Sequence, residues 1–285
     1  MGFGMASRLL GAGFPLAVFN RTAQKAQVLA AKGARAAATP REAATGADVI
    51  VSMVADDEAS RSMWLGERGA LAAASRGAVL VEASTLTPAW VAELAEAAGR
   101  QGCDLLDAPV TGSKPQAASG ELLFLVGGPA AALEKARPVL SVMSRGIVPV
   151  GPSGSGALLK LINNFLCGIQ AAALGEALAM IDKGGLNRDK ALEMLTNGAA
   201  GSPLMKTLVS RLSTDVHNAN FRLALMTKDL AYSLKEAEKC GVSLPMVSAA
   251  HALFQQAVKA GLGDLDFAAI AQSTATHSGT KPSPS

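Results

Sequence analysis

The sequence predicts an α/β protein in which a doubly wound domain with a parallel sheet is followed by an all-helical domain. Three observations support this prediction. The first half alternates short apolar runs with helix-start signals, several of these runs are continuously apolar, and strand signals stop after Val150. Continuously apolar strands are typical of parallel sheets that helices cover on both faces. A chain of 285 residues is long enough for two ordinary domains.

The composition excludes several classes of protein. A hydrophobic content of 49% argues against disorder, and a formal net charge of +3 is too small for a nucleic-acid binder. The three cysteines and three histidines are dispersed, so we expect reduced thiols in a cytoplasmic protein and no metal site. The most apolar long stretch, residues 157–181, carries a lysine, two asparagines, a glutamine and a glutamate, which makes it a poor membrane span.

Helix-start signals follow most of the apolar runs in the first half. Thr39-Pro40 with Glu42 combines an N-cap, a proline at the first helical position and a glutamate at the third. Asp56, Thr87-Pro88 and Pro129 open later helices in a similar way. The expected strands are residues 16–19, 48–54, 78–82, 104–107, 122–126 and 147–150.

After a glycine-rich loop at residues 151–156, the pattern is helical. The expected helices are residues 157–183, 188–197, 203–212, 222–240 and 245–260. We therefore expect an α/β domain at residues 1–151, a helical domain at 152–272 and a disordered tail at 273–285.

The N-terminal residues match part of a dinucleotide-binding turn. In such folds a strand, a glycine-rich turn and a helix N-terminus hold the pyrophosphate. Here residues 1–6 (MGFGMA), with Gly2 and Gly4, lead directly into a helix through Leu10. The hydrophobic strand and the first two glycines that should precede this helix are absent, so the two glycines alone are weak evidence.

Asn20-Arg21-Thr22 stands near the end of the next expected strand. NAD-binding folds place an acidic residue there, about 20 residues after the turn, on the ribose hydroxyls. An arginine and a hydroxyl suit the 2′-phosphate of NADP, because a guanidinium pairs with phosphate through a planar fork. The segment therefore favours NADP over NAD, and a solvated turn arginine is the alternative.

A lysine and two asparagines share one face of the long helix that begins near Ala157. Lys160, Asn163 and Asn164 are spaced i, i+3 and i+4, and apolar residues surround them. Buried polar groups need partners, and burial disfavours the charged form of a lysine. Lys160 is therefore a candidate general acid/base.

Four blocks, in order along the chain, resemble the β-hydroxyacid dehydrogenase family, which includes 3-hydroxyisobutyrate dehydrogenases, tartronate semialdehyde reductases and glyoxylate/succinic semialdehyde reductases. Residues 1–10 resemble the end of its Gly-x-Gly-x-x-Gly turn and its first helix, and residues 107–113 (DAPVTGS), with Ala117 and Gly120, its substrate-binding signature. Residues 151–164 resemble the entry to its catalytic helix, and residues 226–230 (MTKDL) its Lys-Asp-Leu block.

The resemblance implies a Rossmann-type domain and an enzyme that transfers a hydride between NADP(H), or NAD(H), and a small β-hydroxy acid or the corresponding semialdehyde. It implies that Lys160 is the catalytic acid/base, that Asn164 orients the substrate and the lysine, and that Asn163 supports substrate binding. The backbone amides of Thr111, Gly112 and Ser113 would bind the substrate carboxylate. The implied cofactor-binding residues are Gly2, Met5, Asn20, Arg21, Thr22, Met53, Val54, Thr85, Phe221, Lys228 and Asp229.

Three of these assignments have plain structural alternatives. Ser84 and Thr85 could simply cap the helix that follows Pro88, Lys228-Asp229 could be a solvated pair on a helix, and Thr111–Ser113 could be an ordinary turn. Ser113-Lys114 is closer to the glyoxylate and succinic semialdehyde reductases than to the hydroxyisobutyrate enzymes. Imine-reducing relatives usually have another residue in place of the catalytic lysine, so the presence of Lys160 argues against an imine-reducing activity.

The sequence departs from the family pattern at the N-terminus. The family's first strand, on the order of ten residues, has no counterpart before Met1, so we expect a gap or an exposed apolar flank in the sheet. Either the native protein begins upstream, or the chain is a truncated, catalytically weak or inactive module that acts mainly through dimerisation. The apolar helix from Ala157 favours a homodimer or homotetramer.

Overall fold

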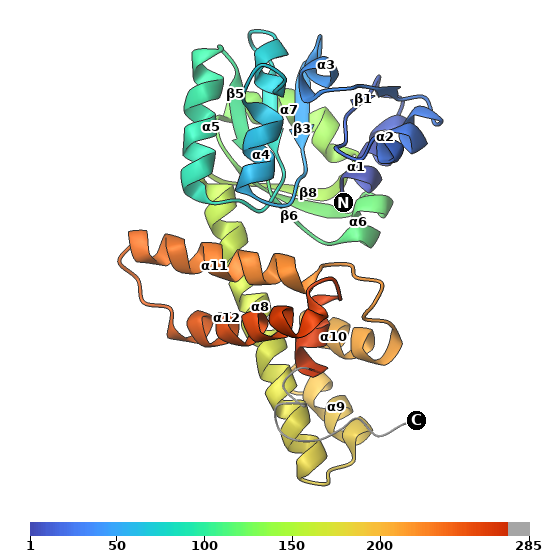
Figure 1. The fold of residues 1–285 in the computed structure, drawn as a ribbon, viewed down its shortest axis with the longest axis vertical. Coiled ribbons are helices and arrows are strands. Elements are labelled where there is room, and N and C mark those ends of the chain that lie inside the picture. Colours follow the sequence, from blue (N-terminus) through green and yellow to red (C-terminus); the bar gives the residue numbers. More distant parts are fainter. Residues whose placement is uncertain (273–285) are drawn as a thin grey trace. The chain divides into compact units, whose positions relative to one another are not determined.

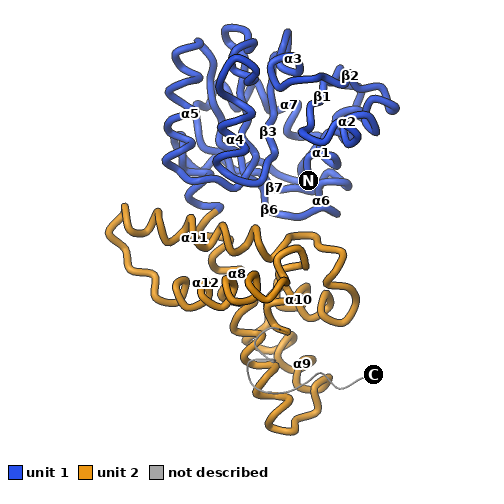
Figure 2. Tube along the Cα trace, viewed as in Figure 1, with its two compact units in different colours: residues 1–160 blue, residues 161–285 orange. Residues whose placement is uncertain are grey.

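The computed structural model describes residues 1–272, and it divides into two compact units (Figures 1 and 2). Unit 1 is Met1–Lys160 and unit 2 begins at Leu161. The division falls inside helix α8 (Ser155–Lys183), and Ala157 in the first turn of this helix is part of a core cluster of unit 1. The tail expected at 273–285 lies outside the described residues.

A six-stranded sheet forms the centre of unit 1 (Figure 1). Its order is β3-β4-β5-β7-β6, and β8 also pairs with β7. The expected parallel pairing is found for β3–β4, β4–β5 and β7–β8. The strands are β3 (Val49–Ser52), β4 (Val79–Glu82), β5 (Asp104–Asp107), β6 (Val110–Thr111), β7 (Leu122–Gly127) and β8 (Ser144–Gly151).

Two pairings differ from the all-parallel expectation. Strand β7 runs antiparallel to β5 and to β6, and β6 itself was not predicted. Only α6 (Lys114–Ser119) and its flanking turns lie between β6 and β7. A parallel connection needs a crossover of about a dozen residues or more, so this short link imposes antiparallel pairing.

The sheet is interrupted before β3, as expected from the sequence. Strands β1 (Ala17–Val18) and β2 (Arg35–Ala36) pair in parallel as a separate two-stranded sheet. Strand β2 was not predicted, and no ladder within residues 1–272 joins either strand to β3. Three of the four residues of β3 are only half-buried, whereas all four residues of β4 are buried.

Helices cover both faces of the six-stranded sheet. Alternate residues of β4 point to opposite faces, so Val79 and Val81 pack with α1, α6 and α7, whereas Leu80 packs with α3, α4 and α5. The helices of unit 1, besides α6 and the start of α8, are α1 (Gly2–Gly11), α2 (Ala23–Ala30), α3 (Pro40–Ala44), α4 (Asp57–Trp64), α5 (Pro88–Arg100) and α7 (Ala130–Ser141), with a 3₁₀ turn at Ala70–Ala73.

The predicted N-caps of three helices are confirmed. The Thr39 hydroxyl accepts the Glu42 N–H at 3.0 Å before α3, and the Thr87 hydroxyl accepts the Trp90 N–H at 3.2 Å before α5. Asp56 accepts the Ala59 N–H at 2.8 Å before α4. These bonds satisfy backbone donors that a helix leaves unpaired in its first turn.

The N-terminal turn expected at residues 1–6 is helical instead. Helix α1 begins at Gly2, so Gly2 and Gly4 lie in its first turn. A Cβ on Gly4 would lie 2.9 Å from the carbonyl carbon of Ala117 in α6, well inside normal contact distance. Gly4 therefore serves the close packing of α1 on α6.

Unit 2 is helical throughout its described residues. Its core forms where α8 packs with α10, α11 and α12, and Leu178, Leu230 and Phe254 lie fully inside it. Besides α8, the helices are α9 (Arg188–Asn197), α10 (Pro203–Thr214), α11 (Leu223–Lys239) and α12 (Pro245–Ala257), followed by a π-helical turn at Val258–Leu262 and a 3₁₀ turn at Phe267–Ala269.

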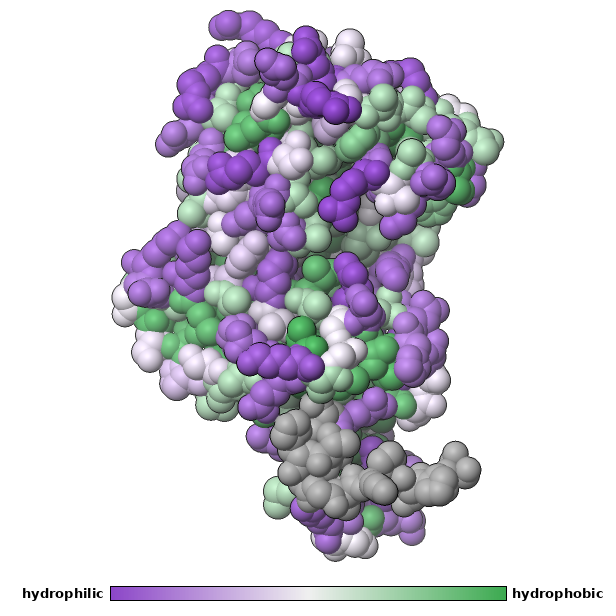
Figure 3. All heavy atoms as spheres, viewed as in Figure 1, coloured by the Kyte–Doolittle hydropathy of each residue, from purple (hydrophilic) through white to green (hydrophobic). Residues whose placement is uncertain are grey.

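Helix α8 is the one helix of residues 1–272 that is long and apolar enough to cross a membrane by length and composition alone. The core helix of a soluble protein meets the same criterion, so this is weak evidence. Two polar side chains, Lys160 and Asn164, are buried on α8. On the face drawn in Figure 3, hydrophilic side chains are spread over both units between smaller hydrophobic areas.

Candidate active site

Asp107, at the end of β5, fixes the first turn of α8. Its Oδ1 accepts the Gly154 N–H at 2.8 Å and its Oδ2 accepts the Ala157 N–H at 2.8 Å. Burial raises the pKa of this carboxyl, and the bonds from the backbone of Gly154 and Ala157 lower it. A Cβ on Gly127 would lie 2.5 Å from Asp107 Oδ1, so the carboxylate fits only because Gly127 has no side chain. The sequence did not predict this role for Asp107.

Lys160 lies in the second turn of the helix that Asp107 anchors. Its side chain is buried, with 8% of the residue exposed. Lysine is among the residues least often buried, so this position needs an explanation beyond solvation. Asp107 and Lys160 both belong to unit 1. The anchored turn therefore fixes the position of the Lys160 backbone relative to the end of β5.

Asn164 follows Lys160 by one helical turn and is held by two partners within unit 2. Its Nδ2 donates to Asp229 Oδ2 at 2.6 Å, and its Oδ1 accepts from Asn163 Nδ2 at 2.9 Å. Asp229 also forms an ion pair with Lys228, whose Nζ lies 2.9 Å from Asp229 Oδ1. Asp229 is 1% exposed, so the Lys228–Asp229 pair is not a solvated surface pair. The structure brings these four predicted residues together.

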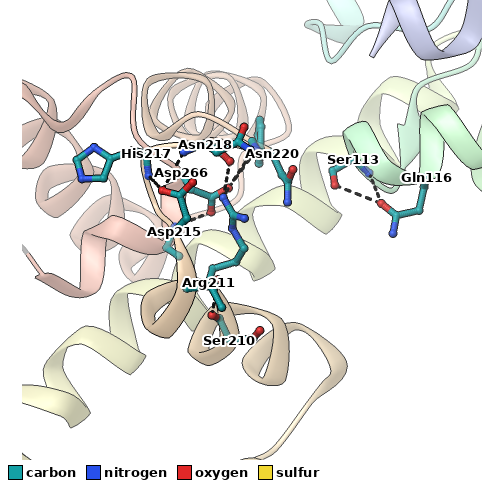
Figure 4. A network of polar contacts seen from close by, with 12 residues as sticks. Ser113, Gln116, Ser210, Arg211, Asp215, His217, Asn218, Asn220 and Asp266 are labelled. Carbon is teal, nitrogen blue, oxygen red and sulfur yellow. Dashed lines mark hydrogen bonds and ion pairs between the residues drawn. The ribbon is translucent and has the colours of Figure 1, made fainter.

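The Thr111–Ser113 turn was expected to offer backbone amides to a carboxylate. Gly112 adopts φ +103°, a backbone conformation that favours glycine. The Ser113 N–H donates to Gln116 Oε1 at 2.9 Å, and the Ser113 hydroxyl donates to the same oxygen at 3.2 Å (Figure 4). The Gln116 side-chain carbonyl therefore occupies the Ser113 amide, and the sequence did not predict this contact.

Basic groups gather around the N-terminus of α1. The pKa of the Met1 amine is lowered by burial and, after that, by the charges of Lys114 and Lys25. The free N–H groups of a helix start and nearby lysines form a donor set that suits a pyrophosphate. Gly2 lies beside Met53, since a Cβ built on it would be 3.7 Å from Met53 Cβ. Met5, by contrast, is 3% exposed and belongs to the core beneath the helix.

Asn20, Arg21 and Thr22 lie between β1 and α2, and all three are exposed. Asn20 Oδ1 accepts the Thr22 N–H at 2.9 Å, which shapes the turn before the helix. Thr22 is the N-cap of α2. An exposed arginine beside a helix N-terminus is open to a phosphate group.

The ends of β3 and β4 are tied together beside Met53 and Thr85. The Val54 N–H donates to the Ser84 hydroxyl at 2.7 Å, so Ser84 does not cap α5; Thr87 does. The carboxyl ends of neighbouring parallel strands are where doubly wound folds bind their ligands. Met53, Val54 and Thr85 therefore lie on one edge of the six-stranded sheet, as predicted.

Phe221 lies in the segment that precedes α11. Its ring packs edge-on against Phe267, with the ring centroids 5.5 Å apart. Asp266 accepts the N–H groups of Asn220 and Phe221, at 2.9 and 3.4 Å, and lies 3.6 Å from the Arg211 guanidinium (Figure 4). The sequence did not single out Asp266, because its partners are distant in the chain.

No group of three or more His, Cys, Asp or Glu side chains that could hold a metal ion is found among residues 1–272. A buried lysine and an oriented carboxamide, on a fold whose strand ends and helix start suit a dinucleotide, define an NAD(P)-dependent oxidoreductase.

Comparison with known families agrees with this class. Residues 1–151 match the NAD-binding domain of 6-phosphogluconate dehydrogenase, and residues 154–274 match the NAD-binding domain of NADP-dependent 3-hydroxyisobutyrate dehydrogenase. The chain belongs to the β-hydroxyacid dehydrogenase family.

Similar proteins share nearly the whole chain. An NAD-dependent L-serine dehydrogenase of Pseudomonas aeruginosa is 34% identical over 277 residues, which cover 95% of this chain and 93% of the relative. Glyoxylate/succinic semialdehyde reductase 1 of Arabidopsis thaliana is 32% identical, with 95% and 93% covered. The structure of Mycobacterium tuberculosis 3-hydroxyisobutyrate dehydrogenase with L-serine aligns with a TM-score of 0.87 at 30% identity, covering 96% of this chain and 95% of that one. An inactive module acting through dimerisation is not favoured.

Proposed function

We propose that the protein interconverts a small β-hydroxy acid and its semialdehyde, and that it prefers NADP(H) to NAD(H). The observation that carries this proposal is the placement of Lys160. A buried lysine follows the helix turn that Asp107 anchors, and it precedes by one turn a carboxamide that Asp229 holds in place. Groups fixed in this way can act on one substrate atom without reorganising.

Lys160 is the proton donor and acceptor in this proposal. During reduction its Nζ delivers a proton to the carbonyl oxygen of the semialdehyde, and during oxidation it accepts the proton of the hydroxyl group. Asn164 Nδ2 carries two hydrogens, one of which goes to Asp229, so the second can orient the substrate oxygen. The bound nicotinamide cofactor supplies or receives the hydride.

The Thr111–Ser113 turn binds the substrate carboxylate in this proposal. Gln116 Oε1 already accepts from the Ser113 N–H and hydroxyl, so it stands in for a carboxylate oxygen there. A carboxylate is a stronger acceptor than a carboxamide, and it would displace Gln116 from this amide. Asn163, which donates to Asn164, supports the substrate from unit 2.

The preference for NADP rests on the turn between β1 and α2. Arg21 and Thr22 are exposed there, and no carboxylate occupies the Asn20–Thr22 segment to bind ribose hydroxyls. Gly2, Met53, Val54 and Thr85 would line the rest of the cofactor. Met5 would act from beneath α1, and Lys228, Asp229 and Phe221 are the remaining proposed cofactor residues.

A substrate and cofactor panel tests the proposal. We expect the purified protein to oxidise 3-hydroxyisobutyrate or serine, or to reduce the corresponding semialdehyde, with kcat/KM at least about tenfold higher with the NADP pair than with the NAD pair. Equal efficiency with both cofactors would contradict the NADP preference alone. No turnover of any small hydroxy acid or semialdehyde would contradict the function itself.

We also propose a cytoplasmic homodimer or homotetramer, with residues 1–151 as the cofactor domain and 152–272 as the substrate and dimerisation domain. An apolar stripe on α8, formed by Leu158, Leu159, Ile162 and Leu166, is between 37% and 51% exposed. Such a stripe suits burial by a second copy. Light scattering on protein from the soluble cell fraction should give two or four chains per particle, and a monomer would refute the assembly.

A further inference from the structure

A buried carboxylate at the end of β4 has no part in the chemistry described so far. Glu82 is 1% exposed, and no ion pair with it is found in the part of the chain that the structure describes. It accepts hydrogen bonds from the Ser60 hydroxyl at 2.6 Å, the Trp64 indole at 2.7 Å and the Ser84 N–H at 3.0 Å, and the Ser84 hydroxyl is a further partner. Burial raises the pKa of Glu82, and these bonds lower it.

The bonds of Glu82 divide into two arms. One arm is structural: Ser60 and Trp64 lie one turn apart on α4, and the Ser60 hydroxyl also accepts the Trp90 indole N–H of α5 at 2.9 Å. This arm holds α4 and α5 on the sheet. An uncharged hydrogen-bonded or apolar arrangement could do the same at a lower desolvation cost.

The other arm leads to the strand ends that would receive the cofactor. Glu82 Oε1 holds the Ser84 backbone, and the Ser84 hydroxyl holds the Val54 N–H at 2.7 Å. The segment is fixed again at Thr87, whose N–H and hydroxyl both donate to Asp57, at 3.0 and 2.7 Å. Thr85 lies between these two anchors, and Met53 precedes Val54.

We propose that Glu82 is a positioning residue for the nicotinamide cofactor, acting through Ser84 on the ends of β3 and β4. The inference rests on the proposed function, since it assigns these strand ends to the cofactor. Losing the Ser84 arm lets the Val54 and Thr85 segments move, and a small displacement of a binding segment weakens its ligand.

Three variants separate the two arms. Glu82→Gln replaces one acceptor oxygen with an NH₂ group, which faces donors and cannot accept their hydrogen bonds. The variant therefore disturbs both arms. Ser84→Ala removes the acceptor of the Val54 N–H and one hydroxyl partner of Glu82, and it keeps the bonds from the Ser84 N–H, Ser60 and Trp64 to Glu82. Trp64→Phe removes one donor of the structural arm and leaves the Ser84 arm intact. Glu96→Gln, on the exposed face of α5, is the matched control for removing a carboxylate.

The test is NADPH binding, measured by the fluorescence of the cofactor itself and without turnover. We expect Kd to rise about tenfold in Glu82→Gln and about fivefold in Ser84→Ala, and to stay within about twofold of the wild type in Trp64→Phe and Glu96→Gln. A Kd in Ser84→Ala equal to that of the wild type would overturn the proposal, even if Glu82→Gln failed to fold. If the wild-type protein bound no NADPH, this result would contradict the proposed function as well.

Protein fluorescence gives a second readout. The chain has two tryptophans, and both indole N–H groups belong to the Glu82 network. We expect Glu82→Gln to shift the tryptophan emission, and Ser84→Ala to shift it much less while still weakening NADPH binding, because Ser84→Ala keeps both indole hydrogen bonds. A Ser84→Ala variant with altered tryptophan emission and unaltered NADPH affinity would show that Glu82 stabilises the fold and does not position the cofactor.

Discussion

Replacing Lys160 with alanine should lower kcat by about a hundredfold to ten-thousandfold, the usual contribution of a general acid/base. Lys160 is the one predicted proton donor on α8, and no water replaces a positioned ammonium at equal efficiency. Lys160→Arg should be similarly slow, because arginine keeps the positive charge but does not release its proton. Steady-state turnover with the best substrate and NADPH of the panel measures both variants.

Lys183→Ala is the control for this prediction, because Lys183 is exposed at the other end of the same helix. It should keep its turnover. NADPH affinity in Lys160→Ala should change less than about threefold, since the lost group acts on the substrate oxygen. A Lys160→Ala enzyme with near-normal kcat would exclude the proposed proton transfer.

Replacing Asp107 with asparagine should damage both stability and turnover. The two carboxylate oxygens accept the Gly154 and Ala157 N–H groups, and asparagine offers only one oxygen to the pair. The second N–H then faces an amide nitrogen, at a cost of about 1–3 kcal/mol for an unsatisfied buried donor. The melting temperature should fall by several degrees. Because Lys160 follows in the next turn of α8, kcat should also fall by about tenfold to a hundredfold.

The relation between kcat and KM distinguishes a role in positioning from a role in stability alone. We expect the KM for the carboxylate substrate to change less than kcat in Asp107→Asn, because the Thr111–Ser113 turn does not depend on the lost bond. Asp104→Asn, at the exposed start of the same strand, is the control and should be nearly neutral. A destabilised Asp107→Asn enzyme with unchanged kcat would show that the anchored turn does not govern Lys160.

Much of the fold could be predicted because its signals are local. The caps at Thr39, Asp56 and Thr87 and the apolar runs of β3, β4 and β5 can be found within a few residues of sequence. The two-residue strand β6 could not, because its pairing with β7 arises from tertiary structure and leaves no periodic pattern. The antiparallel pairing of β7 has the same origin.

The candidate site was only partly predictable for a related reason. The spacing of Lys160 and Asn164 on one helix is a local signal, and both side chains are buried. Asp107 and Glu82 act through partners that lie 50 and 18 residues away in the chain, Ala157 and Trp64. A carboxylate at the end of an apolar strand is the one local signal that both share, and it does not reveal which backbone groups the carboxylate will meet.

The separation of the two sheets in unit 1 has a further consequence. Gly2, Asn20, Arg21 and Thr22 belong to the block formed by α1, β1, α2 and β2, whereas Met53, Val54 and Thr85 belong to the six-stranded sheet. Within residues 1–272 no backbone ladder joins these two assemblies, and α1 is held by side-chain packing through Met5 and Leu9. A dinucleotide bound to both groups of residues would therefore act as a cross-link between them. Cofactor binding would then stabilise the domain against separation of these two assemblies, by an amount that grows with the ratio of cofactor concentration to Kd.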